Sequence, residues 1–110
     1  MEAEGRAHSA KALSDLQDLV DALAKALPRR KSWQRQLHVH VCEVDRLMQL
    51  LRKLNSLGRD AGEVGVAIGE IQRELRAANA YVAAGRTDMG TSMAVQMAAD
   101  LGKQLTAKPG

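Results

Sequence analysis

The sequence has very few of the residues that build β-rich cores. Phenylalanine is absent, aromatic residues make up 2% of the 110 residues, and there are only 2 prolines. Alanine, leucine, arginine, glutamine and methionine are common instead, and these residues favour helices, whereas sheets favour aromatic and β-branched residues. The composition therefore predicts an all-α protein.

Features of membrane-spanning and secreted chains are also absent. Cys42 is the single cysteine, which rules out an internal disulfide and suits a reducing compartment. There is no apolar run long enough for a membrane span and no charged-then-apolar leader. We expect a cytoplasmic protein that does not associate with a membrane.

Patterns of catalytic sites are missing as well. No serine or cysteine has a base at a helical contact spacing, and there are no phosphate-binding glycine loops or clustered carboxylates. We therefore expect a binding or assembly protein, not an enzyme, with no cofactor. Met89, Met93 and Met97 fall at helical spacing, and we expect them to lie in the core.

Four stretches show apolar residues at helical spacings of three and four, at about residues 7–27, 32–57, 61–84 and 88–106. The expected core positions are Leu13, Leu16, Val20, Leu23 and Leu27 in the first stretch; Leu37, Val41, Val44, Met48 and Leu51 in the second; Val64, Ile68, Ile71, Leu75, Ala78 and Val82 in the third; and Met93, Ala94, Met97, Leu101 and Leu105 in the fourth.

The ends of these stretches carry helix-capping residues. Ser32 is the expected N-cap of the second helix, Asp60 of the third, and Thr87 or Asp88 of the fourth, while Gly58 suits the position after the second helix. Because the connections are short, successive helices should run antiparallel. We predict one domain over residues 1–110, an up-down-up-down four-helix bundle.

The second helix is apolar over more of its circumference than one neighbour requires. A second strip runs beside its core positions: Val39, Leu47, Leu50, Leu54 and Leu57. This width is typical of a central helix or of a subunit interface. In the third stretch, Gly62, Gly65 and Gly69 predict close approach of a neighbouring helix, since an interior glycine costs roughly 1 kcal/mol relative to alanine.

Positive charge is concentrated in one part of the chain. The net charge is +3, but residues 28–59 carry eight lysines and arginines against two acidic residues. These cations are Arg29, Arg30, Lys31, Arg35, Arg46, Arg52, Lys53 and Arg59. Such asymmetry accompanies polyanion binding, and it is also produced by a helix with a solvated basic face.

Three histidine patterns invite other interpretations. His38 and His40 lie on opposite sides of a helix and cannot bind one ion together. His38 and Cys42 are four residues apart and could bind one ion, but no third ligand has matching spacing, so we expect no metal site. Arg35 and His40 match the arginine–four residues–histidine spacing of the HEPN ribonucleases. A HEPN-like ribonuclease is therefore an alternative, which would cleave RNA without metal and lose this activity in His40→Ala.

The segment AHSAKALS resembles the phosphotransfer motif of histidine-phosphotransfer domains. In that pattern His8 would accept the phosphoryl group and Lys11 would neutralise its charge. Those domains place the histidine in a central helix, whereas His8 lies close to the beginning of this chain. We therefore do not favour this interpretation.

Taken in order, the segments resemble one family of four-helix bundle proteins. LPRRKSW resembles the family's phenylalanine-proline-arginine turn, and LHVHVCEVDRLMQLLRKLN resembles its long second helix, with Asn55 at the end. ELRAANAYVAAG corresponds to the third helix, and DLGKQL, with Gly102 and Lys103, to the close of the fourth, whose cap is Thr87. The chain thus resembles the accessory variability determinants of diversity-generating retroelements and the 23S rRNA intervening-sequence proteins.

The resemblance implies a basic, non-catalytic bundle that assembles into a pentameric barrel. Its partners would be a reverse transcriptase and its RNA template or cDNA, in mutagenic reverse transcription. We predict nucleic-acid contacts, mostly to phosphates, from seven residues: Arg29, Arg30, Lys31, Arg35, Arg46, Arg52 and Lys53. The other alternative is a helical adaptor or chaperone that binds a protein partner without nucleic acid.

Overall fold

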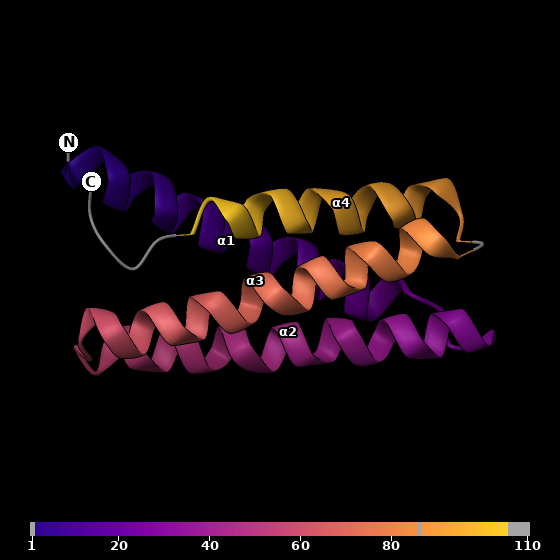
Figure 1. Cartoon of the computed structure of the whole chain (residues 1–110), viewed down its shortest axis with the longest axis horizontal. Helices are drawn as coiled ribbons and strands as arrows, with labels where there is room; N and C mark the ends of the chain where they lie inside the picture. Colours follow the sequence, from indigo (N-terminus) through magenta and orange to yellow (C-terminus); the bar gives the residue numbers. More distant parts are fainter. Residues whose placement is uncertain (1, 86, 106–110) are drawn as a thin grey trace.

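In the computed structural model, residues 2–85 and 87–105 form four helices and no strand, which confirms the predicted all-α bundle (Figure 1). Side chains are described for residues 10–85 and 87–105. The helices are α1 (Glu2–Ala26), α2 (Ser32–Ser56), α3 (Ala61–Ala84) and α4 (Met89–Lys103). Within these residues no helix is both long and apolar enough to cross a membrane.

Each helix packs against its neighbours in the chain, and α1 also packs against α4. Within the described residues the backbones of α2 and α4 do not approach each other closely, nor do those of α1 and α3, so the helices occupy the four corners of a bundle around one core. The most extensive packing joins α2 and α3, which Figure 1 shows lying alongside each other. The outward faces of α2 and α4 therefore lie on opposite sides of the molecule.

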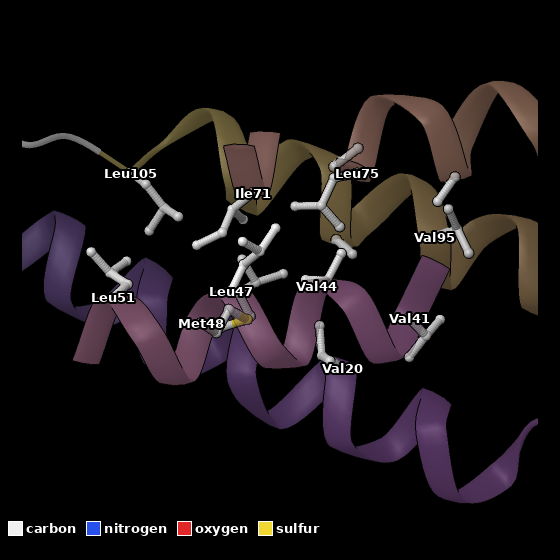
Figure 2. Close-up of a cluster of buried hydrophobic side chains, with 14 of the residues drawn as sticks. Val20, Val41, Val44, Leu47, Met48, Leu51, Ile71, Leu75, Val95 and Leu105 are labelled. Atoms are coloured by element: carbon white, nitrogen blue, oxygen red, sulfur yellow. The ribbon is translucent and has the colours of Figure 1, made fainter. Parts of the chain in front are cut away.

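The core contains the expected positions of the first three helices, with Leu13 and Leu23 of α1 partly buried at its edge. In α2 and α3 every predicted core residue is buried, and Leu16, Leu37 and Ile71 are completely inaccessible. Figure 2 shows these helices directing valine, leucine and isoleucine side chains into one cluster, with Met48 among them. The helical periodicity of the sequence thus correctly identified the inward faces of α1, α2 and α3.

The core prediction for α4 is wrong at its methionines. Its inward residues within the helix are small, namely Val95, Ala98, Ala99 and Gly102, whereas all three of its methionines are exposed; the predicted core residue Leu105, just beyond the helix, is buried. The reason is the close approach of α3: a Cβ placed on Gly102 would lie 2.6 Å from Cδ1 of Leu75. Large side chains do not fit on this face, so the methionines point outward.

Two of the three glycines expected to admit a neighbouring helix in α3, Gly62 and Gly69, do not do so. A Cβ on Gly69 would meet nothing within 4 Å, and one on Gly62 would meet only Asp60 of the same turn. Gly58 takes the expected position after α2 with φ of +68°, where its amide and that of Arg59 donate to carbonyls of the last turn. This is the bonding pattern of a Schellman motif.

Candidate nucleic-acid interface

Four of the predicted nucleic-acid contacts lie together where the chain passes from α1 to α2. Arg29, Arg30 and Lys31 are exposed in the connection, and Arg35 is exposed on the first turns of α2. We call these four residues the basic corner. Within the described residues, none of the four forms an ion pair with a carboxylate.

The shape of the basic corner is fixed by Gln34, a residue that sequence reasoning missed. Its side chain is buried, and its Oε1 accepts hydrogen bonds from the backbone amides of Arg30, at 3.0 Å, and Lys31, at 2.9 Å. Lys31, not Ser32 as expected, is the N-cap residue of α2. The glutamine three residues after the cap was the available signal, because a glutamine at this position commonly bonds back to the cap amide.

Arg35 also stabilises the backbone of the connection, through its carbonyl oxygens. Its guanidinium donates to the carbonyl oxygen of Arg30 at 2.8 Å, and more weakly to that of Arg29 at 3.4 Å. A guanidinium keeps its charge when it bonds to neutral carbonyls, and it has five N–H donors. Arg35 therefore satisfies the carbonyls of the connection with hydrogen bonds, and the positive charge of the corner is not neutralised.

Trp33 attaches the corner to the bundle. Its side chain is half-buried and packs against the core cluster, and the preceding Leu27 is fully buried at the end of α1. Indole rings bury a large apolar area, so this contact holds the connection on both sides. Trp33 thus anchors the corner to the core.

The remaining predicted contacts are distributed over two faces of α2. Arg46 and Lys53 are exposed on the helix, about 16 and 27 Å along the axis from Arg35. Arg52 points about 100° away from Lys53. It lines a groove of about 390 Å³ between α1 and α2, together with Asp18 and Asp21.

Arg46 is also engaged within its own helix. Its Nε donates to Oε2 of Glu43 at 3.0 Å and its Nη2 to Oε1 at 2.5 Å. This bidentate contact lowers the pKa of Glu43 and raises the pKa of Arg46. The pair is therefore charged at neutral pH, and Glu43 offsets the positive charge that Arg46 would present to a phosphate.

His40 and Arg35, the pair of the HEPN-like alternative, have separate partners. Five helical positions place them about 140° apart around the helix. His40 Nδ1 lies 2.6 Å from Oε1 of Glu74 on α3, in a half-buried pair beside the ring of Tyr81, whose centroid is 5.9 Å from that of His40. The structure thus ties His40 to α3 and Arg35 to the basic corner.

The other histidine patterns are placed as follows. Nδ1 of His38 lies 3.5 Å from Sγ of Cys42, and the cysteine is exposed. No group of three His, Cys, Asp or Glu side chains that could hold a metal ion occurs in the described part of the chain. Lys11 pairs with Asp15 at 3.2 Å, while the side chain of His8 lies outside the described residues.

No protein-family model, curated protein or solved structure matches the chain. The function of the basic corner therefore has to be inferred from its chemistry.

Proposed function

We propose that the chain is a non-catalytic nucleic-acid-binding accessory protein, and that it supports a reverse transcriptase in a diversity-generating retroelement. The observation that carries the binding part of this proposal is the basic corner, where Arg29, Arg30 and Lys31 are exposed and form no ion pair among the described residues. Lys31 acts on Asp88 only at longer range. The reverse transcriptase and retroelement context comes from the sequence resemblance alone.

The geometry of the corner favours phosphates over bases. The three cations stand on a connection whose backbone is fixed by Gln34 and Arg35, so little ordering is required on binding. Trp33 is packed against the core, and the other aromatic residue, Tyr81, lies beside His40. Binding should therefore depend on the charge of the backbone, with weak sequence preference.

The proposal also includes the assembly that the resemblance implies. We infer an up-down-up-down order from the short connections between neighbouring helices. The pentameric ring and the cytoplasmic location are also part of the proposal, and they rest on the sequence alone. The ring would use the outward face of α2, where Val39, Leu50 and Leu57 remain exposed. Leu47 and Leu54, the other residues of the second apolar strip, are buried and half-buried against the core and are not available for contacts between subunits.

The first prediction removes charge from the corner. Arg29→Gln/Arg30→Gln should weaken binding of a labelled single-stranded RNA and reduce the slope of log K against log salt by about 1.4, because each lost phosphate contact contributes roughly 0.7. Fluorescence anisotropy between about 50 and 200 mM salt measures both quantities. The same RNA on a denaturing gel shows whether it is cleaved.

The matched control is Arg73→Gln/Arg76→Gln, which removes the same charge from exposed positions of α3. It should leave the salt slope nearly unchanged. Equal slopes for the two double variants would show that only net charge matters and would contradict an interface at the corner. RNA cleavage that is lost in His40→Ala would instead favour the HEPN-like alternative.

A second candidate function is the helical adaptor. Val39 and Leu57 are each 60% exposed on α2, more than a solvated helix face requires, and they suit an apolar partner helix. If no RNA or DNA binds at low salt while Val39→Gln abolishes capture of a protein partner, the adaptor replaces the nucleic-acid proposal.

A further inference from the structure

The exposed large apolar residues of α4 are all methionines. Met89, Met93 and Met97 are 77%, 58% and 56% exposed and follow one another at intervals of four residues. We call these three residues the methionine face. Met48, in contrast, is completely buried in the core, where methionine fills irregular space. Packing within the chain therefore explains Met48 but not the methionine face, whose accessible chemical group is the thioether sulfur.

We propose that the methionine face binds a soft monovalent cation of the Cu⁺ or Ag⁺ class, with Met93 and Met97 as its two thioether ligands. Thioether sulfur is a soft ligand that selects ions such as Cu⁺, whereas Mg²⁺ and Ca²⁺ prefer oxygen ligands. The proposed site uses residues of α4 and its neighbour α1, so it does not depend on nucleic-acid binding.

The spacing of the methionines allows two of them to bind one ion. Residues four apart in a helix lie on the same face, with Cβ atoms about 5–6 Å apart. Methionine is unbranched and has three rotatable bonds, so at exposed positions two neighbouring sulfurs can turn toward one ion. Met93 can share an ion in this way with either Met89 or Met97. Met89 and Met97 are about 12 Å apart along the axis and cannot chelate an ion without Met93.

A carboxylate favours the pair that contains Met97. Asp100 lies one helical turn beyond Met97, on the same side of α4. Both residues line a groove of about 390 Å³ between α1 and α4, and Asp15 of α1 lines it as well. A cation held by Met93 and Met97 would therefore lie beside negative charge, which raises its local concentration and offsets its own charge.

The neighbours of these carboxylates identify Asp100 as the main contributor. Asp15 pairs with Lys11 at 3.2 Å, whereas Asp100 has only a long contact of 4.0 Å to Lys103. At the other end of α4, the carboxylate of Asp88 accepts hydrogen bonds from the first turn of the helix. Asp100 is thus the carboxylate on this side of α4 that is least engaged with other groups.

The test is a titration of the full chain with silver nitrate in chloride-free buffer, followed by NMR of the methionine methyl groups. A Cys42→Ser background removes the exposed thiol, which also binds soft ions. The methyl signals of Met93 and Met97 should shift together with one saturable affinity, whereas that of the buried Met48 should not move. Binding should be at least about tenfold tighter than that of N-acetylmethionine amide, because the second thioether binds intramolecularly. An affinity equal to that of this single thioether would overturn the proposal.

Leucine substitutions separate ligation from packing. Leucine is apolar, similar in volume and favourable in helices, but lacks the sulfur, so the variants should keep their fold. Met93→Leu should reduce the affinity to that of a single thioether, whereas Met89→Leu, the same change on the same face, should leave it nearly unchanged. Asp100→Asn should weaken binding a few-fold, and this effect should fade as salt is raised. No loss in Met93→Leu, or equal losses in Met93→Leu and Met89→Leu, would overturn the proposed pair of ligands.

Discussion

At the scale of single residues, two helical glycines with different neighbours should respond in opposite directions to the same substitution. Gly102→Ala places a methyl group 2.6 Å from Leu75 Cδ1 in the core, and overpacking of this kind costs about 1–3 kcal/mol. Gly69→Ala meets nothing within 4 Å and should stabilise α3 by up to about 1 kcal/mol. Urea denaturation of both variants measures the difference in free energy of unfolding.

Gly69→Ala is also the control for Gly102→Ala, since both add one methyl group to a helical glycine. If Gly102→Ala were as stable as Gly69→Ala, Leu75 would have moved aside without loss, and the close packing of α3 against α4 would not explain why α4 turns small residues inward.

At the scale of helices, the sequence predicts some elements better than others. Leucine, isoleucine and valine at spacings of three and four occur on one face of α3, so periodicity alone identifies the buried face correctly. In α4 both faces are apolar, one with methionines and the other with alanines and a glycine. From hydropathy we expected the methionines to be buried. The short separation between α3 and α4, which cannot be read from the sequence, leaves room only for the small residues at this contact.

The same contrast applies to the candidate site. The surplus of cations in residues 28–59 is visible in the sequence, and so is the turn at Pro28. Hydrogen bonds of Gln34 and Arg35 to backbone atoms hold the cations of the basic corner together. Arg52 points toward α1 and lies apart from them. These are tertiary features that the composition and charge count could not provide.

The start of α4 should make stability depend on pH. The pKa of Asp88 is lowered chiefly because its carboxylate accepts hydrogen bonds from the backbone amide and the hydroxyl of Thr91, at 2.9 and 2.8 Å, and to a lesser extent because of the charge of Lys31. The unfolded chain therefore binds this proton more readily than the folded chain. The stabilisation is complete above the ordinary carboxyl pKa and is lost as the pH falls through the lowered, folded value.

Asp88→Asn keeps an oxygen acceptor and removes the ionisation. We expect the melting temperature of the wild type to fall more than that of Asp88→Asn between about pH 7 and about pH 3. Thermal melts followed by circular dichroism measure both. Thr91→Val, which removes the hydroxyl donor and keeps the amide, should lie between them; parallel curves for all three proteins would rule out a contribution of this cap to the pH dependence.

At the scale of the whole molecule, the basic corner lies at the same end of the bundle as the start of α4, since the charge of Lys31 contributes to the lowered pKa of Asp88. An assembly that leaves two basic corners exposed would offer two contacts to one nucleic acid. A nucleic acid long enough to reach both corners would bind twice, and the second contact would be intramolecular, which raises apparent affinity by up to about 10²–10⁴.

This geometry predicts a dependence of affinity on RNA length. The wild type, assembled through α2 as proposed, should bind a long single-stranded RNA much more tightly than a short one, whereas Val39→Gln, on the exposed face of α2, should bind the two with similar affinity per site. Arg29→Gln/Arg30→Gln should weaken binding to both RNAs and leave the mass of the protein unchanged. Anisotropy titrations with the two RNAs, combined with sedimentation of the same samples, separate the effects. A length dependence that persists in Val39→Gln at the mass of a monomer would place the second binding site within one copy.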